Sequence, residues 1–181
     1  REGSPQFLDE YCMHHSIGLE IIQPVSDDGH SISSSRIRQL IQDGFVRRAN
    51  FELGSVFGFI ATVIHGAGRG KELNFPTANV VPVEKNQLMP KPGVYFTRGR
   101  IIGLQAYGMC NFGTRPTFDE HELVLEIHFF HDELDNLYGK EIRVEFLERI
   151  RDEKKFPSPE ELKSQLQKDK LRCLELQGKY E

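Results

Sequence analysis

Short apolar runs separated by turn residues fill the chain from Val56 onward. The runs predict strands over residues 56–64, 78–81, 93–98, 101–111, 122–130 and 141–149. Turn residues between them lie at 90–93, 98–100, 113–116 and 138–140. Connections of this length join antiparallel neighbours, and closing such a sheet into a barrel removes its exposed edges. The pattern therefore predicts an antiparallel β-barrel.

A helical pattern follows the last predicted strand. Ser158 is the expected N-cap, Pro159 takes the first helical position, and Glu161 completes a capping box. The apolar positions on or near one face of this helix are Leu162, Leu166, Cys173 and Leu174. We expect the helix to cover one side or one mouth of the barrel.

Residues 1–54 follow a different pattern. We expect a helix with Ser4 as N-cap and Pro5 at its first position, then a short buried strand at 18–25. A second helix is expected to start at the serines of residues 33–35 and to stop at Gly44. This order is that of the end of an α/β domain. Because one strand and two or three helices cannot bury a core alone, the segment is either a remnant of a larger domain or packs on the rest of the chain.

Composition limits the classes of function. With 27 acidic and 23 basic residues among 181, the formal net charge is −4, so no global positive field is available to hold duplex DNA. The cysteines, Cys12, Cys110 and Cys173, lack C-x-x-C spacing, which argues against a disulfide framework and a structural zinc site and favours a reducing, cytoplasmic setting. We see neither an apolar run of membrane-spanning length nor a leader pattern. Since the chain begins with Arg1, we expect a truncated or processed form.

The stretch HGAGRGKELNFPTANV, residues 65–80, carries the first candidate chemistry. It is one residue too short for a Walker A motif, and Glu72 stands where that motif has Ser or Thr; no helix follows, as a dinucleotide fingerprint requires. Its glycines still let the backbone approach an anion closely, with cations beside them. A basic loop without a ligand is the alternative. The residues concerned are Gly66, Gly68, Arg69, Gly70 and Lys71.

Thr77 and Asn79 are two residues apart in an extended segment, so their side chains face the same side. A hydroxyl and an amide oxygen suit a hard cation such as Mg²⁺, which needs few protein ligands when substrate phosphates supply the rest. The alternative is that both side chains bond to local backbone in a turn after Pro76.

Glu126 lies in an alternating strand among large apolar residues. A carboxylate buried in such a place is costly unless it has a partner, and burial moves a carboxyl pKa toward the range useful to a general base. A solvent-facing or salt-bridged residue is the alternative. His128 and His131 are poorly spaced for joint metal ligation, so we interpret them as surface or ligand-edge histidines.

The segment RIRDEKKF, residues 149–156, follows the last predicted strand. Arg151, Lys154 and Phe156 provide a planar cation, a point charge and an aromatic face, a combination that suits a flat heterocycle with polar edges. A charged linker capped by one core phenylalanine is the alternative.

The order of these motifs resembles that of the riboflavin kinase family. GRGKELNFPTANV, PKPGVY, CNFGTRPTF, LEIHFF and LYGKEIRVEFLERIRDEKKF follow one another in register, over about residues 55–178. The resemblance implies a mainly β fold: a closed, six-stranded antiparallel Greek-key barrel with a C-terminal helix at 55–181, after a small α/β segment at 1–54. It also implies transfer of the γ-phosphoryl group of ATP to the 5′-hydroxyl of riboflavin, giving FMN and ADP.

The resemblance assigns roles residue by residue. Glu126 is implied as the general base, and Thr77 and Asn79 as the ligands of Mg²⁺, or of Zn²⁺ in its place. The implied flavin-binding residues are Arg151, Lys154 and Phe156. The implied ATP-binding residues are Gly66, Gly68, Arg69, Gly70, Lys71, Thr77, Phe129, His131 and Tyr138.

The front of the chain resembles the closing part of the FMN adenylyltransferase domain that precedes the kinase in bifunctional bacterial-type enzymes. REGS and ISSSRIRQLIQDGFVRRANFELG carry this likeness, with the serines at a helix N-terminus that suits phosphates. Most of that domain, including its early histidine motif, is absent, so we do not expect FAD synthesis by this chain.

We expect a cytoplasmic monomer with small-molecule partners and without nucleic-acid or membrane partners. Two other hypotheses stay open. One is a non-catalytic flavin- or nucleotide-binding barrel. The other is a single-stranded nucleic-acid-binding barrel, against which the net acidity and the lack of Trp count.

Overall fold

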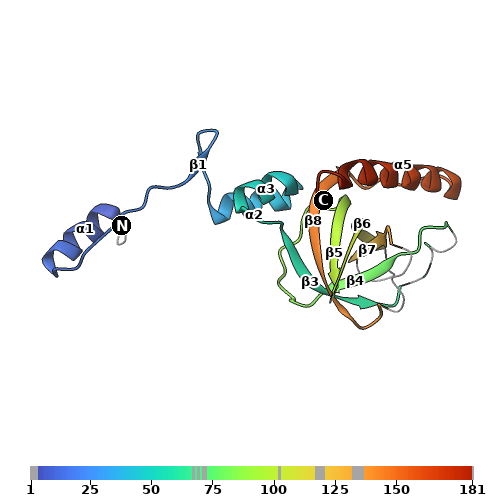
Figure 1. Ribbon diagram of the computed structural model, residues 1–181, viewed down its shortest axis with the longest axis horizontal. Coiled ribbons are helices and arrows are strands. Elements are labelled where there is room, and N and C mark those ends of the chain that lie inside the picture. Colours follow the sequence, from blue (N-terminus) through green and yellow to red (C-terminus); the bar gives the residue numbers. More distant parts are fainter. Residues whose placement is uncertain are drawn as a thin grey trace. The chain divides into compact units, whose positions relative to one another are not determined.

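The computed structural model describes residues 4–66, 68, 70, 73–101, 103–116, 121–131 and 137–180, apart from the side chains of 114–116 and 121–123. The chain forms two compact units, Arg1–Ser33 and Ser34–Glu181. Figure 1 shows both and labels most of their helices and strands.

The first unit contains a helix and a short hairpin. Helix α1 (Pro5–His14) begins as predicted: the Phe7 N–H donates to Ser4 Oγ at 3.2 Å, and Pro5 takes the first position. Strands β1 (Ser26–Asp27) and β2 (His30–Ser31) pair with each other. Residues 18–25 form no strand and are exposed, so the prediction of a buried strand there is wrong. An apolar run becomes a strand only where a neighbouring strand pairs with it.

Six strands of the second unit close into an antiparallel barrel, which confirms the predicted fold class (Figure 1). They are β3 (Gly58–Ile64), β4 (Ala78–Pro82), β5 (Gly93–Ile101), β6 (Leu104–Pro116), β7 (His121–Phe129) and β8 (Glu141–Arg151). Their order around the barrel is β3, β4, β7, β6, β5, β8, and pairing of β8 with β3 closes it. Strands β5, β6 and β7 pair in succession, while β7 returns to lie beside β4, as in a Greek key.

Two predicted turns are parts of strands instead. Strand β5 continues through Arg98-Gly99-Arg100 to Ile101, and β6 continues through Gly113 to Pro116. The Phe129 ring explains why position 99 is a glycine, because a Cβ there would lie 2.6 Å from that ring. A glycine that looked like a turn residue therefore serves close approach within the sheet.

The inward-facing residues of the strands fill the barrel. Its buried core includes Phe59, Ala61, Val63, Val80, Tyr95, Cys110, Phe112, Leu125, Ile127, Ile142, Val144 and Phe146. Burial, and after it the charge of Glu126, raises the pKa of the Cys110 thiol. Cys110 is therefore a core residue and not a nucleophile.

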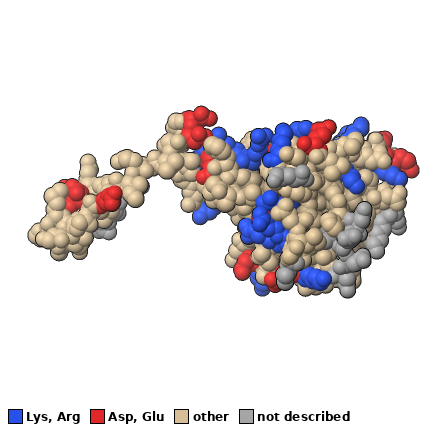
Figure 2. All heavy atoms as spheres, in the orientation of Figure 1, with Lys and Arg blue, Asp and Glu red and all other residues tan. Residues whose placement is uncertain are grey.

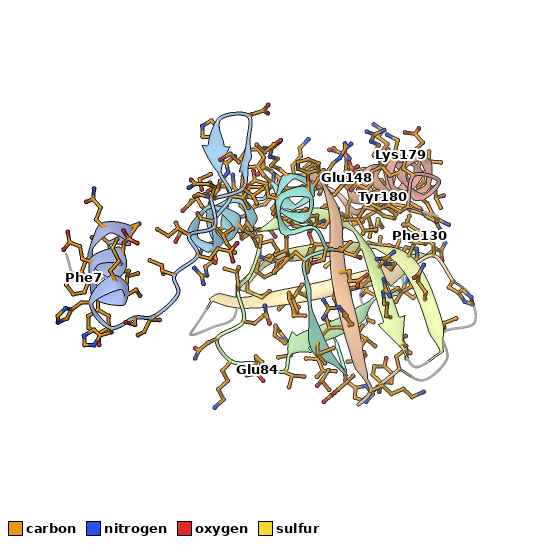
Figure 3. All side chains as sticks on the ribbon, turned by 60° about the vertical axis from the view of Figure 1, so that its left-hand side comes forward. Phe7, Glu84, Phe130, Glu148, Lys179 and Tyr180 are labelled. Atoms are coloured by element: carbon orange, nitrogen blue, oxygen red, sulfur yellow. The ribbon has the colours of Figure 1, made fainter. Side chains whose placement is uncertain are left out.

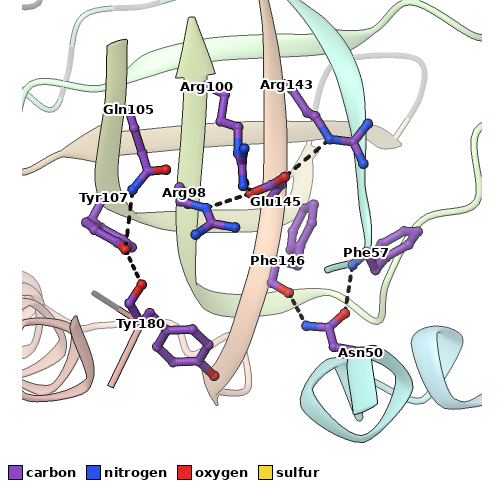
Figure 4. A network of polar contacts seen from close by, with 10 residues as sticks. All are labelled: Asn50, Phe57, Arg98, Arg100, Gln105, Tyr107, Arg143, Glu145, Phe146 and Tyr180. Atoms are coloured by element: carbon purple, nitrogen blue, oxygen red, sulfur yellow. Dashed lines mark hydrogen bonds and ion pairs between the residues drawn. The ribbon is translucent and has the colours of Figure 1, made fainter. Parts of the chain in front are cut away.

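Helices α2 (Ser34–Gln42) and α3 (Val46–Leu53) pack on the barrel, with Ile41 and Val46 buried in the same core. Asn50 ties α3 to the sheet: its Oδ1 accepts from the Phe57 N–H at 2.7 Å and its Nδ2 donates to the Phe146 carbonyl at 2.9 Å (Figure 4). These two helices thus belong to the compact unit that contains the barrel. A domain boundary between residues 54 and 55 stays a prediction.

Helix α5 (Pro159–Gln177) packs against the outer face of the barrel. Ser158 is its N-cap as predicted, since Ser158 Oγ accepts from the Glu161 N–H at 3.2 Å. A second apolar cluster lies between α5 and the strands: Phe75, Phe96, Met109, Leu147, Cys173 and Leu176. Leu174, expected on or near the apolar face, is 42% exposed, and Leu176 is buried instead. None of the helices that the structure describes is long and apolar enough to cross a membrane.

Tyr180 continues this packing beyond α5 (Figure 3). Its hydroxyl donates to Glu148 Oε1 at 3.1 Å, and its carbonyl accepts from the Tyr107 hydroxyl at 2.8 Å. Burial, and then the negative charge of Glu148, raises the pKa of Tyr180 to about 12. The chain end after α5 is thereby attached to β6 and β8.

Glu145 lies on the outer face of β8 among three arginines (Figure 4). The Nε atoms of Arg98 and Arg100 lie 2.6 and 3.1 Å from Glu145 Oε2, and Arg143 Nε lies 3.3 Å from Oε1. Figure 2 shows Lys and Arg side chains gathered on one face of the barrel. Although burial works to raise it, the pKa of Glu145 is held below its usual value by Arg98 and Arg100.

We predict that Glu145→Gln lowers the free energy of unfolding by about 1.5–3 kcal/mol at neutral pH, because a buried carboxylate loses charge-assisted hydrogen bonds. The folded-state pKa is depressed, so the contribution is present above the unfolded-state value of about 4.3 and disappears as pH falls through the folded-state value. Urea denaturation of both proteins at about pH 7 and about pH 3 measures the difference.

Glu175→Gln is the control, because Glu175 forms an exposed pair with Arg172 at 3.0 Å. Its effect should stay within about 0.5 kcal/mol. An effect of Glu145→Gln that is equally large at both pH values would contradict the role of the charge.

Candidate active site

A cavity of about 320 Å³ lies on the outer face of the barrel. Its floor comes from β4, β7 and β6, and α5 contributes a wall through Leu162 and Leu166. The loop before β4 forms another wall with Phe75, and the segment after β8 forms a third. The cavity is thus built from parts of the chain that the strand order brings together.

Three polar side chains form a row across the cavity floor. Asn79 on β4 and Asn111 on β6 are the direct cross-strand partners of Glu126 on β7. Residues that are directly opposite face the same side, with Cβ atoms about 4.5–5.5 Å apart. All three line the cavity, Asn79 is 5% exposed, and Glu126 is half-buried. One carboxylate therefore lies between two amides.

Thr77 and Asn79 line the cavity together, while Ala78 between them packs against the barrel core. Their hydroxyl and amide oxygens are donors that fit a hard cation such as Mg²⁺. Gly66 lies against Asn79: a Cβ at Gly66 would be 2.0 Å from Asn79 Nδ2. Only glycine allows this approach. Among the residues described, no group of three or more His, Cys, Asp or Glu could hold a metal ion.

The three predicted flavin-binding residues also line the cavity. The Arg151 guanidinium lies 5.7 Å from the centroid of the Phe156 ring, and Lys154 Nζ lies 5.6 Å from it. Arg151 is held by Asp169 on α5, with Nη2 to Oδ2 at 2.7 Å. Two cations and an aromatic ring therefore form one cluster on the cavity wall.

Asp169 was not predicted, because the helical pattern over α5 identifies only apolar positions. It falls on the same stripe as Leu162, Leu166 and Cys173, and it is 2% exposed. An acidic residue at a core-facing position needs a partner, and that requirement is the signal that could have identified it.

His128 and Asn111 also line the cavity. Asn111 was not predicted to do so, whereas a ligand-edge position was one of the two interpretations of His128. His128 is buried, its Nδ1 lies 2.9 Å from the Pro76 carbonyl oxygen, and its ring packs against Phe75 at 5.1 Å. It is not a surface histidine, and the ligand-edge alternative fits its position. His128 is two residues from Glu126 on the same strand, so the two side chains face the same side of the sheet. This spacing is the feature of the sequence that could have placed His128 in the cavity.

Four of the predicted ATP-binding residues that the structure describes do not line this cavity: Gly66, Phe129, His131 and Tyr138. Phe129 packs against the barrel core, His131 is exposed, and Tyr138 stacks on His65 with ring centroids 3.8 Å apart. Since His65 precedes Gly66, which touches Asn79, the chain itself connects this ring pair to the cavity. Gly68 and Gly70 line the cavity, whereas Arg69 and Lys71 lie outside the described residues.

Comparisons with known proteins identify a family that the chain matches. Residues 53–176 match the family described as Flavokinase, riboflavin kinase. The chain is 37% identical over 160 residues to the bifunctional riboflavin kinase/FMN adenylyltransferase of Bacillus subtilis, covering 87% of this chain and 50% of that protein. It is 35% identical over 179 residues to the protein of the same name from Escherichia coli, covering 98% and 56%.

A solved structure has the same fold. The crystal structure described as a macrolide-efflux protein from Streptococcus pneumoniae matches with a TM-score of 0.81 at 36% identity, covering 91% of this chain and 53% of that one. The chain spans about half the length of the curated relatives it matches.

Gly70 supports the loop wall of the cavity. Its carbonyl accepts from the Phe75 N–H at 2.8 Å, and a Cβ at Gly70 would lie 2.2 Å from the Phe75 carbonyl oxygen. We predict that Gly70→Ala displaces Phe75 and lowers the free energy of unfolding by about 1–3 kcal/mol, the usual cost of overpacking. Urea denaturation measures this change.

Gly178→Ala is the matched control, because Gly178 has φ of −61° and no atom within 4 Å of a Cβ built there. Its effect should stay within about 0.5 kcal/mol. Equal effects of the two substitutions would show that the close contact at Gly70 is unimportant.

Proposed function

The chain belongs to the riboflavin kinase family, and on that basis we propose that it transfers the γ-phosphoryl group of ATP to the 5′-hydroxyl of riboflavin. The products are FMN and ADP. The observation that carries the proposal is the row of Asn79, Glu126 and Asn111 on the floor of a cavity whose walls include Thr77 and the cationic-aromatic cluster.

The two substrates would approach Glu126 from different walls. A flat, neutral isoalloxazine ring suits the Arg151, Lys154 and Phe156 cluster beside apolar Leu162. The phosphates of ATP suit the glycine loop, where the backbone can approach an anion closely. The adenosine would then extend toward Phe129, His131 and Tyr138.

Glu126 is the proposed general base. The riboflavin 5′-oxygen attacks the γ-phosphorus, the bond from that phosphorus to the oxygen it shares with the β-phosphorus breaks, and ADP leaves. The hydroxyl proton passes to the Glu126 carboxylate. Asn79 and Asn111, one on each side, restrict where that carboxylate can lie. Positioning of the two substrates supplies most of the rate enhancement in such a transfer.

Thr77 and Asn79 would hold the Mg²⁺ of the nucleotide. A bound cation of this kind neutralises phosphate charge. The buried position of Asn79 and its contact with Gly66 fix one of these oxygen donors.

The proposal does not include adenylyl transfer to FMN. That activity appears in the names of the curated relatives, and this chain spans about half of their length. Small molecules are the proposed partners, while a monomeric state and a cytoplasmic setting stay predictions.

The first experiment incubates the chain with riboflavin, ATP and Mg²⁺ and separates the flavins by chromatography. We expect FMN. A chain that binds riboflavin without Mg²⁺ and makes no FMN under saturating conditions is a non-catalytic flavin-binding barrel, and the proposal then fails.

Glu126→Gln tests the base. We expect kcat to fall about 10²- to 10⁴-fold, since the amide cannot accept the proton, with riboflavin binding retained. Steady-state FMN formation gives kcat, and quenching of flavin fluorescence gives binding. Glu84→Gln, at an exposed glutamate outside the cavity (Figure 3), should leave both unchanged. If Glu126→Gln turns over normally, the base is another group.

Gly66→Ala tests the metal ligands, because its Cβ would displace the Asn79 side chain. We expect a rate about 10- to 100-fold lower at limiting Mg²⁺, partly restored at high Mg²⁺. Initial rates across a Mg²⁺ titration measure this. Gly18→Ala, at a position with no atom within 4 Å, is the control. An unchanged Mg²⁺ dependence of Gly66→Ala would remove Asn79 from the proposed metal site.

A further inference from the structure

Asp169 is a buried carboxylate in the apolar interface between α5 and the barrel. It is 2% exposed and lies on the helix between the cavity residues Leu162 and Leu166 and the buried Cys173. Burial, and then the charge of Asp169, raises the pKa of the Cys173 thiol to about 12. A carboxylate in this environment costs free energy unless it is paired and hydrogen-bonded.

Two side chains satisfy Asp169. Arg151 Nε lies 3.1 Å from Oδ1 and 2.9 Å from Oδ2, and Arg151 Nη2 lies 2.7 Å from Oδ2. Gln165, one turn earlier on α5, donates from Nε2 to Oδ1 at 2.8 Å. Both carboxylate oxygens are therefore occupied, and Gln165 fixes the rotation of the carboxylate that receives Arg151.

The paired hydrogen bonds from Arg151 to Asp169 determine how Arg151 faces the cavity. The guanidinium is planar and carries five N–H groups. Nε–H and one Nη2–H go to Asp169, and one Nη1–H goes to the Asp152 carbonyl at 2.9 Å. What remains for a ligand is the flat face, near the Phe156 ring, and the two other N–H groups. The plane of the guanidinium is thus held by Asp169 on α5, together with the Asp152 carbonyl beside Arg151.

The pair also changes the electrostatics of the cavity wall. Because Asp169 carries the opposite charge at hydrogen-bonding distance, Arg151 adds little net charge there. A compensated planar cation suits a neutral, flat ring with polar edges better than it suits a phosphate.

We propose that Asp169, supported by Gln165, is a positioning residue for flavin binding: it sets the plane of the Arg151 guanidinium beside Phe156 and compensates its charge. This inference rests on the proposed riboflavin kinase activity. Asp169 acts through Arg151 and does not itself touch the substrate.

Asp169→Asn is the test, with kcat and both KM values measured on the full chain. We expect the KM for riboflavin to rise about tenfold, the lower end of what loss of an orienting partner costs in other sites. The kcat and the KM for ATP should stay within about threefold, because contacts to the flavin ring are made equally in the ground and transition states.

Arg151→Gln and the double variant Arg151→Gln/Asp169→Asn complete a double-mutant cycle, in which the riboflavin KM is compared. If Asp169 acts through Arg151, the riboflavin KM of the double variant should be close to that of Arg151→Gln alone. Glu175→Gln, on the same helix with an exposed pair, is the matched control and should behave like the parent. Independent, multiplying effects of the two substitutions overturn the inference.

If Asp169→Asn does not fold, Asp169→Glu replaces it as the test variant, because it keeps the buried charge but moves the carboxylate by one methylene. We again expect a raised riboflavin KM at nearly normal kcat. A normal riboflavin KM in a folded Asp169 variant overturns this inference alone. A parent chain that makes no FMN overturns the proposed function and this inference with it.

Discussion

Alternation along β7 is the constraint on which both the core and the cavity depend. Leu125 and Ile127 point into the barrel, while Val124, Glu126 and His128 line the cavity on the other face. The strand is held on two sides, by β4 and by β6, so its register is determined twice. A slip of one residue would exchange the faces and put the carboxylate into the core. Packing of the core thereby positions Glu126.

Glycines complete this arrangement where backbone and side chains must come close. Gly66 makes room for Asn79, Gly70 for the Phe75 carbonyl, and Gly99 for the Phe129 ring. Each lies beside a residue of the cavity or of the core rather than in an open turn. The same lack of a side chain that suggested a phosphate loop from the sequence is thus needed to assemble the site itself as well.

Much of the fold and part of the candidate site could be predicted from local sequence pattern. The remainder depends on which strands pair with one another. Period-2 alternation identified the strands and placed Thr77 and Asn79 on one side, and capping residues identified the start of α5. Asn111 could not be found in that way, because its relation to Glu126 exists only once β6 lies beside β7. The strand predicted at 18–25 is wrong for the same reason, since none of the strands that the structure describes pairs with it. Roles such as general base came from resemblance to a family and not from periodicity.

The charges of the cavity differ from one wall to the next. Arg151, the planar cation of the flavin wall, is neutralised by a buried acid that α5 supplies. Thr77 and Asn79 themselves offer neutral oxygens, with glycine backbone nearby and the Glu126 carboxylate on the neighbouring strand. Phosphate binding there cannot draw on a global positive field, because the chain carries a net charge of −4. It must rely on close backbone contact, on local cations and on the metal that accompanies the nucleotide. Under the proposed function, the wall where Asp169 compensates Arg151 would bind the neutral ring and the wall of Thr77 and Asn79 would bind the metal-bound anion, with Glu126 on the floor they share.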